Sequence, residues 1–276
     1  MLDRIAKLQD KSQVAGPVAS IHQVIRPANL NFISAQYPGV LFGIMPLPTS
    51  MTPANNLLRS DQSGTGMPAR EFCLKDDDKS KQIRDLYLKH VVRILELSGE
   101  SQPQATADAQ IVLELETALA NVAMDIAARR DPKNQNNKMS LQQLQALTPS
   151  FNWKAYFTAM HVPDSPAYRS LLLTCSAVWK SWRRPNLLST GRAYLRYSTV
   201  NFTALLLSKP FVDENFDFYG KVISSSQEIQ PRWRRCSAYA DIELGEAVGQ
   251  AYVARYFPPQ NKARHPATAV FRCCAD

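Results

Sequence analysis

The sequence has few glycines, no long apolar run and no apolar leader. Its 276 residues include only 10 glycines, which argues against collagen-like chains, Gly/Ser linkers and, more weakly, a turn-rich β-barrel. No run of 18 consecutive apolar residues occurs, so no transmembrane helix is predicted. Charged residues between Asp3 and Lys11 interrupt any signal peptide at Met1. With 45% apolar residues, the chain is predicted to fold around its own core.

Common catalytic and metal-binding motifs are also missing. The sequence contains no H-E-x-x-H, no C-x-x-C, no G-x-S-x-G elbow and no G-x-x-x-x-G-K-[ST] loop. We interpret Gly64-Thr65-Gly66 as a turn and His90 as a packed or surface residue. The acidic run Asp76–Asp78 is interpreted as helix N-terminal charge, because it lacks the spacing of a calcium loop. From the residues alone we assign no catalytic, cofactor-binding or metal-binding residue.

The five cysteines give no disulfide framework. An odd number without an export signal fits free thiols, and one or two disulfides are the alternative for an exported chain. The state of Cys73, Cys175 and Cys236 stays open at this point. The adjacent pair at positions 273 and 274 is too close to the C-terminus to anchor much of the fold.

Positive charge concentrates in residues 165–212. This stretch contains seven lysines and arginines and no acid, whereas the other 25 basic residues are balanced by all 24 acids, and the net charge is +8. Such a field attracts phosphates, carboxylate termini or an acidic partner domain. The interleaved Trp179, Trp182, Tyr194 and Tyr197 offer a stacking platform for single-stranded nucleic acid. We favour aromatic residues in a helical core with solvated arginines, because no nucleic-acid module accompanies the charge.

Apolar residues recur at three- and four-residue spacing through most of the chain, which predicts amphipathic helices. One helix is expected over Lys79–Ser98, ended by Gly99, and a second over Thr106–Ala128. Ser140 and Gln143 have the spacing of a capping box at the start of a short helix. Further helices are expected over residues 153–160, 168–182 and 232–256.

Two regions qualify this helical pattern. In the last helix Trp233, Leu244 and Val248 are among the residues expected to face inward, and Gly245 and Gly249 predict a close helix–helix approach. Residues 24–60 hold five prolines and few charges, and two segments there, Val40–Ile44 and Asn56–Arg59, predict a short hairpin. The predicted fold class is mainly α, with a short β-hairpin near residues 40–60.

Several sequence blocks between about Gln62 and Lys262 together resemble a known family. They are Gln62–Leu74 (Q-S-G-T-G-M-P-A-R-E-F-C-L), Leu115–Ala120, Arg129–Pro132, Asn137–Leu141, Pro149-x-Phe151-x-Trp153, Asn215–Gly220, Gln230–Cys236 and Leu244–Val253. In this order they are similar to the N-terminal domain of the neprilysin/endothelin-converting-enzyme family of zinc metallopeptidases, whose bacterial members are oligopeptidases. Cys73 stands where that family has a tyrosine.

The resemblance implies a multi-helical capping lobe over residues 1–264, diverged at 25–56, with a non-family tail at 265–276. In that family this lobe encloses a chamber that admits only oligopeptides, and a second lobe holds zinc through H-E-x-x-H. None of the second lobe's motifs occurs here. We therefore expect that the catalytic zinc domain is absent, that zinc is a cofactor of the full-length family only, and that this chain alone is inactive.

Two functional hypotheses follow. The chain is a piece of a zinc metalloendopeptidase, whose partners are the missing catalytic lobe and oligopeptide substrates, or a non-catalytic helical binding or remnant protein. Nucleic-acid binding through residues 165–212 is a weaker third, and we expect neither a nucleic-acid partner nor a membrane segment. A truncated or frameshifted gene and a partial gene model fit the sequence equally. The resemblance implies a periplasmic or extracellular location, whereas the sequence as written, without a leader, implies the cytoplasm.

Overall fold

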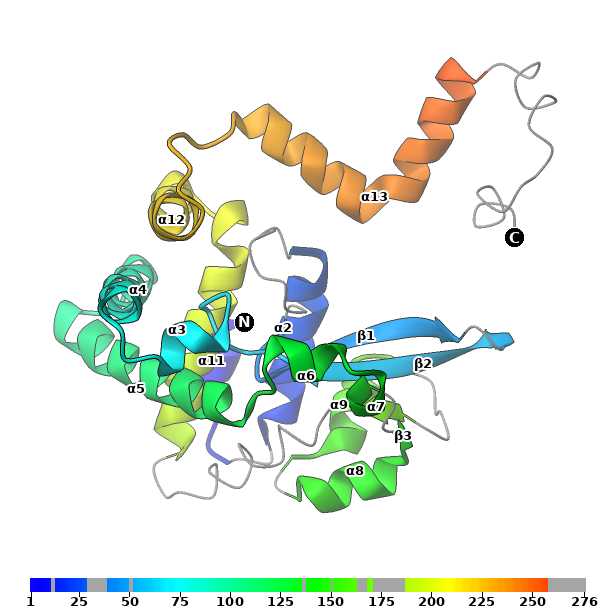
Figure 1. Cartoon of the computed structure of the whole chain (residues 1–276), viewed down its shortest axis with the longest axis horizontal. Helices are drawn as coiled ribbons and strands as arrows, with labels where there is room; N and C mark the ends of the chain where they lie inside the picture. Colours follow the sequence, from blue (N-terminus) through cyan, green and yellow to red (C-terminus); the bar gives the residue numbers. More distant parts are fainter. Residues whose placement is uncertain are drawn as a thin grey trace. The chain divides into compact units, whose positions relative to one another are not determined.

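The computed structural model describes residues 1–10, 13–28, 39–49, 52–135, 138–149, 151–162, 168–170 and 187–257. The chain divides into two compact units, Met1–Gln227 and Glu228–Asp276, which are considered separately. Helices dominate both, so the predicted fold class is confirmed (Figure 1). The elements are α1 (Leu2–Ala6), α2 (Ala15–Ala28), β1 (Phe42–Thr49), β2 (Thr52–Gln62), α3 (Arg70–Leu74), α4 (Asp78–Leu97), α5 (Gln102–Val122), α6 (Ile126–Arg130), α7 (Pro132–Gln135), β3 (Lys138–Met139), α8 (Leu141–Leu147), α9 (Trp153–Ala159), β4 (Tyr168–Ser170), α11 (Leu187–Thr203), η2 (Ala204–Leu206), α12 (Lys209–Asn215), the π-helix η3 (Phe216–Ile223) and α13 (Arg232–Tyr256).

The helices α4 and α5 form the left side of the first unit in Figure 1 and pack on each other and on α11. The Asp77 side chain accepts a hydrogen bond from Ser80 N at 2.9 Å and caps α4, and Gly99 follows the helix with φ of +98°. The acidic run is therefore a helix start, as predicted. The capping box of Ser140 and Gln143 is also confirmed, with both of its hydrogen bonds present at α8.

The second predicted helix is too long at its C-terminal end. α5 ends at Val122, and a new short helix, α6, starts after Asp125, whose side chain accepts from Ala128 N at 2.7 Å. Gln62 pairs its side-chain amide with the backbone N and O of Met124, at 2.8 and 2.9 Å. These tertiary hydrogen bonds compete with helical ones, so the helix breaks although the apolar periodicity continues.

The predicted hairpin is confirmed and is longer than expected. β1 pairs antiparallel with β2, with Phe42 opposite Gln62, and the four-stranded sheet has the order β1-β2-β4-β3. β4, at Tyr168–Ser170, pairs parallel with β2 and antiparallel with β3. The helix predicted over residues 168–182 is therefore wrong at its start, because strand pairing with distant segments overrides the local pattern. Residues 171–182 lie outside the described part of the chain.

An aromatic cluster fills the core where α2, α9 and β1 meet. Phe42, Phe151, Trp153 and Tyr156 are each 1% exposed or less, with ring centroids 4.7–5.8 Å apart. His22 joins them: its Nδ1 lies 2.7 Å from the Tyr156 hydroxyl, and Val40 N donates to its Nε2 at 3.0 Å. Burial lowers the pKa of His22 to about 4, so the ring is neutral at pH 7.

In the second unit, α13 has the predicted bounds but not the predicted packing. Its backbone is kinked at Leu244, where φ is −123° and ψ is 22°. Trp233 and Leu244 are 68% and 59% exposed, and a Cβ built on Gly245 or Gly249 meets no atom within 4 Å. The expected inward packing and close helix approach are therefore wrong within this unit, because its described residues hold a single helix and no partner for it.

We expect far-UV circular dichroism of the purified chain to show the paired minima characteristic of α-helix, because helices supply most of its ordered backbone. A soluble sample with a spectrum dominated by β-structure would contradict the fold.

Candidate functional site

The block Gln62–Leu74, which we call the signature block, contains two positions, 64 and 66, where only glycine fits. Gly64 has φ of +100°, and its carbonyl accepts a hydrogen bond from the Tyr194 hydroxyl at 2.7 Å. At Gly66 the Tyr87 ring lies so close that an added Cβ would be 2.0 Å from its hydroxyl oxygen. The structure assigns no hydrogen-bonded turn at Gly64-Thr65-Gly66, where the chain is irregular and a bend begins at Gly66. This segment, which we call the signature turn, contacts α4 and α11 through Tyr87 and Tyr194.

The buried carboxyl group of Glu116 hydrogen-bonds both to Tyr87 and to the backbone of Gly66. The Tyr87 hydroxyl donates to Glu116, with distances of 2.8 and 2.9 Å to its two oxygens, and Glu116 also accepts from the Gly66 backbone N–H. Glu116 is 1% exposed and belongs to the sequence block Leu115–Ala120. Burial raises the pKa of Glu116 to about 8, and it also raises that of Tyr87.

The network continues from the other side of Gly66. Tyr219, from the block Asn215–Gly220, donates its hydroxyl to the Gly66 carbonyl at 2.9 Å and accepts from Asn201 Nδ2 at 2.9 Å. Asn201 Oδ1 lies 3.0 Å from His90 Nε2, and His90 Nδ1 lies 2.9 Å from Glu214. His90 is thus the packed residue that was predicted, with both ring nitrogens engaged. We call Gly66, Tyr87, His90, Glu116, Asn201, Glu214 and Tyr219 the Gly66 network.

A partly buried ion pair joins Asp61, the residue before the block Gln62–Leu74, to the block Arg129–Pro132. Arg129 donates to Asp61 Oδ2 at 2.8 Å, and the two side chains are 16% and 1% exposed. Arg129 belongs to one of the family-like blocks, whereas Asp61 lies outside all of them. An isolated acid before a glycine turn carries no sequence signal for this pairing, which depends on the break after α5.

The described residues offer no evident metal centre. Within the described ranges, no three His, Cys, Asp or Glu side chains converge in a way that would hold a metal ion. Cys73 is buried, which raises its pKa to about 12, and Cys236 is exposed; both are free thiols. Cys175 lies outside the described residues.

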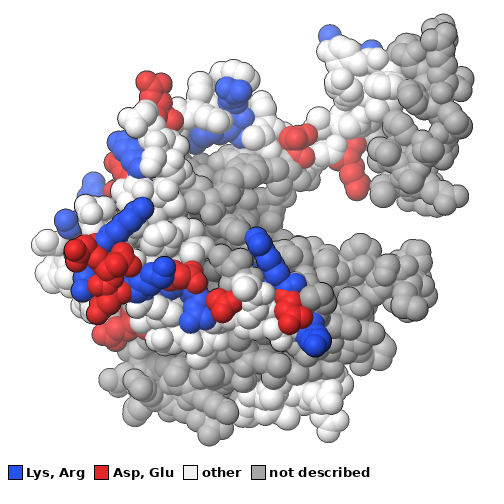
Figure 2. All heavy atoms as spheres, viewed as in Figure 1, with Lys and Arg blue, Asp and Glu red and all other residues white. Residues whose placement is uncertain are grey.

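The basic stretch does not form a stacking surface with its tyrosines. Tyr194 and Tyr197 are buried in α11, so the stacking platform loses two of its four aromatic residues, and Trp179 and Trp182 lie outside the described residues. Lys209 pairs with Asp213 at 2.5 Å. On the face shown in Figure 2, basic and acidic side chains alternate over the described surface.

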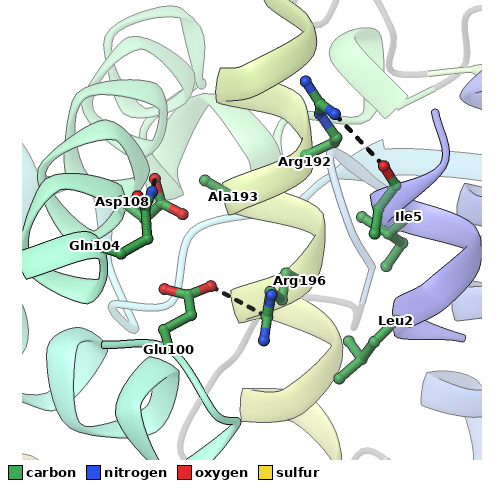
Figure 3. Close-up of a pocket in the computed structure, with 9 residues that line it drawn as sticks. Leu2, Ile5, Glu100, Gln104, Asp108, Arg192, Ala193 and Arg196 are labelled. Carbon is green, nitrogen blue, oxygen red and sulfur yellow. Dashed lines mark hydrogen bonds and ion pairs between the residues drawn. The ribbon is translucent and has the colours of Figure 1, made fainter. Parts of the chain in front are cut away.

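A pocket of about 280 Å³ lies between α1, the start of α5 and α11 (Figure 3). Its lining carries both charges, and the Arg196 Nε lies 3.1 Å from Glu100 Oε1. None of its residues belongs to the Gly66 network. The lining residues are Leu2, Ile5, Ala6, Glu100, Gln104, Asp108, Arg192, Ala193 and Arg196.

Comparison with known proteins shows one consistent relationship. The sequence model of peptidase family M13 matches residues 5–268. Endothelin-converting enzyme 1 of Rattus norvegicus is 25% identical over 239 residues, which are 84% of this chain and 31% of that protein, and the Bos taurus enzyme is 26% identical over 213 residues, 75% of this chain and 28% of that protein. The chain thus spans about a third of the length of these curated relatives.

Solved structures agree with this relationship. The zinc metalloprotease of Mycobacterium tuberculosis in its open state superposes with a TM-score of 0.81 at 25% identity, covering 95% of this chain and 39% of that one. A structure named PEPO, from Lactobacillus rhamnosis, has the same fold, with a TM-score of 0.68 at 16% identity over 95% of this chain and 43% of that one.

Glu116→Gln tests the buried carboxylate of the Gly66 network. With a pKa of about 8 in the folded chain against an ordinary value of 4.5, the folded state binds the extra proton between these pH values. Stability should therefore fall as pH rises from 5 to 8, by up to about 1.4 kcal/mol per pH unit. In urea unfolding measurements, the free energy of unfolding of the variant should therefore fall less steeply between pH 5 and pH 8 than that of the wild type.

The matched control is Glu114→Gln, an exposed carboxylate on the same helix, which should keep the wild-type pH dependence. An unchanged slope in Glu116→Gln would show that this carboxylate is not the group that titrates.

Proposed function

The chain belongs to peptidase family M13, and we propose that residues 1–264 form the N-terminal lobe of a zinc metalloendopeptidase that cleaves oligopeptides. The observation that carries the proposal is the superposition on the Mycobacterium tuberculosis zinc metalloprotease, in which 95% of this chain matches 39% of a longer enzyme. A lobe of this kind acts by admitting small peptides and excluding large folded ones. It orients the substrate and performs no bond cleavage itself.

The rigid core of the first unit supports a capping role. A chamber wall selects substrates by size only if it keeps its shape, and the Gly66 network ties the signature turn to α4, α5, α11 and η3 through buried hydrogen bonds. Buried networks of this kind stiffen a fold because breaking one bond leaves a polar group unsatisfied.

The exposed apolar residues of α13 support the proposal that another part of the full-length enzyme packs on this helix. Leu244, Val248, Tyr252 and Tyr256 recur every four residues and are 41–59% exposed, and the rings of Tyr252 and Tyr256 lie 5.0 Å apart. A helical stripe of this kind is typical of a face that another element covers. We propose that the catalytic lobe of the full-length enzyme covers it.

The only basis for proposing zinc is that relatives of this chain are zinc metalloproteases. We propose that its ligands lie in the part of the relatives' length that this chain does not span, and that the 276 residues hold no zinc themselves. No helix among the described residues is long and apolar enough to cross a membrane. From the family we propose a periplasmic or extracellular location, and no observation favours a nucleic-acid partner.

The genomic DNA downstream of codon 276 tests the proposal directly. A segment encoding H-E-x-x-H, in any frame, would support it. If no such segment follows, the non-catalytic helical binding protein becomes the better hypothesis.

If that segment exists, the double variant Leu244→Asp/Val248→Asp tests the α13 stripe. When the two parts are produced as separate chains, we expect the variant to lose co-purification with the catalytic segment, because two carboxylates would be buried without partners. Glu246→Gln, an exposed change on the same helix, should co-purify as the wild type does. Retained co-purification of the double variant would exclude the stripe as the docking face.

We further predict that the 276-residue chain does not hydrolyse a quenched oligopeptide, with or without added zinc. Metal-assisted cleavage needs an activated water and a general base, and loss of single catalytic groups already costs orders of magnitude in rate. The full-length Mycobacterium tuberculosis zinc metalloprotease serves as the positive control. Turnover that co-purifies with the chain and is blocked by phosphoramidon would contradict the prediction.

A further inference from the structure

The hydrogen bonds beside Gly66 have a direction that can be followed from one residue to the next. The Gly66 carbonyl can only accept, so the Tyr219 hydroxyl, 2.9 Å away, donates its single proton to it. The Tyr219 oxygen therefore accepts from Asn201, whose Nδ2 lies 2.9 Å away. This contact fixes the orientation of the Asn201 amide, because the oxygen and nitrogen ends of an amide are distinguished by their partners.

This orientation places two acceptors at the His90 ring. Asn201 Oδ1 lies 3.0 Å from Nε2 of His90, and an amide oxygen cannot donate. Glu214 Oε1 lies 2.9 Å from Nδ1, and an ionised carboxylate only accepts. A neutral imidazole has one N–H and one bare nitrogen, so it satisfies only one of these acceptors. Both contacts are hydrogen bonds only if His90 and Glu214 together hold one proton more than a neutral histidine beside a carboxylate.

The surroundings of the pair indicate where this proton lies. The Glu214 side chain is 20% exposed, whereas that of His90 is 1% exposed. Contact with water favours the ionised form of Glu214, and the ring then carries both protons as an imidazolium. Burial alone disfavours a charged imidazole, but here a carboxylate neutralises it and both N–H groups have acceptors. The Phe218 ring stacks on it with 5.0 Å between centroids, and an aromatic face attracts a cation.

We propose that His90 is an imidazolium in the folded chain at neutral pH, and that its second proton is a pH-sensitive tie between α4 and α12. Glu214 belongs to α12, which packs on α4 (Figure 1). When the Nδ1 proton is released to solvent at higher pH, a nitrogen lone pair faces a carboxylate oxygen. The hydrogen bond that joins the two helices is then lost, while the Nε2–H bond to Asn201 is kept.

Other ionisable side chains also face the ring from the elements packed around it. Besides Glu214, those among the described residues are the phenols of Tyr87 on α4, Tyr197 on α11 and Tyr219 on η3, with 5.4–6.4 Å between ring centroids. Burial raises the pKa of all three phenols, so they stay neutral where a histidine titrates. Glu116 of α5, with a pKa of about 8, reaches the ring through Tyr87. It therefore titrates as a separate group.

NMR of the 276-residue chain with 15N-labelled histidine reports the ring protons directly. At about pH 7.5 a free histidine, with a pKa of about 6.5, is about nine-tenths neutral and has one bare ring nitrogen. We expect both ring nitrogens of His90 to be protonated at this pH. The buried His22, whose pKa is about 4, gives a neutral ring in the same spectrum. His90→Asn assigns the signal by deleting it.

Glu214→Gln removes the requirement for the second proton, because a glutamine amide can donate to a bare Nδ1. We expect His90 in this variant to be neutral at about pH 7.5, with only Nε2 protonated. Asp213→Asn is the matched control and should keep both ring protons, because Asp213 is the neighbouring acid on α12 and pairs with Lys209 at the surface. A dispersed amide spectrum shows that each variant is folded, and the wild-type spectrum is decisive if Glu214→Gln unfolds.

The backbone amides of residues 213–215 report the tie itself. As pH rises, their signals should shift with the same midpoint as the His90 ring nitrogens. Glu214→Gln should abolish this shared titration, and Glu116→Gln should preserve it. The proposal is overturned if the wild-type His90 ring is neutral at about pH 7.5, if Glu214→Gln keeps both ring protons, if Asp213→Asn loses one, or if the α12 amides do not follow the ring.

Discussion

The contact between Tyr87 and the backbone of Gly66 is the constraint on which the first unit depends. No side chain fits at Gly66, since a Cβ would lie 2.0 Å from the Tyr87 hydroxyl. The hydroxyl is held there because Glu116 accepts its hydrogen bond inside the core. Burial raises the pKa of Glu116 to about 8, so the group is mostly protonated at pH 7, and the hydrogen bonds from Tyr87 and Gly66 offset only part of the cost of its charged form. The signature turn, α4 and α5 are therefore positioned by one polar contact rather than by apolar packing alone.

The sequence predicts best where the determining groups are neighbours in the chain. The helix start at the acidic run Asp76–Asp78, the capping box at Ser140 and the stop at Gly99 each depend on residues within one helical turn, and the structure shows all three. The end of α5 depends instead on Gln62 and Arg70, which bond to Met124 and Ala123 from more than fifty positions away. Apolar periodicity carries no information about such partners, so the predicted helix ran on to Ala128.

The same limit explains α13 and the Gly66 network. A stripe such as Leu244 and Val248 shows that a face requires burial, but it does not identify what covers it, and no described residue of its unit does. Tyr219 and Glu116 were found only as members of sequence blocks, because family resemblance marks positions without giving their contacts. Their meeting at Gly66 brings together three blocks that lie about fifty to one hundred and fifty residues apart in the sequence.

The basic stretch shows why charge counted along a sequence is not charge on a surface. Residues 165–212 contain no acid, yet Arg196 of this stretch lies 3.1 Å from Glu100, which lies in the connection between α4 and α5. Asp108 lines the same pocket, so a segment with a uniformly positive sequence contributes to a site with both charges. A long-range attraction for polyanions requires an excess of charges of one sign on the surface. The acids of other segments, such as Glu100 beside Arg196, therefore reduce the uniformly positive field that the sequence of residues 165–212 predicts.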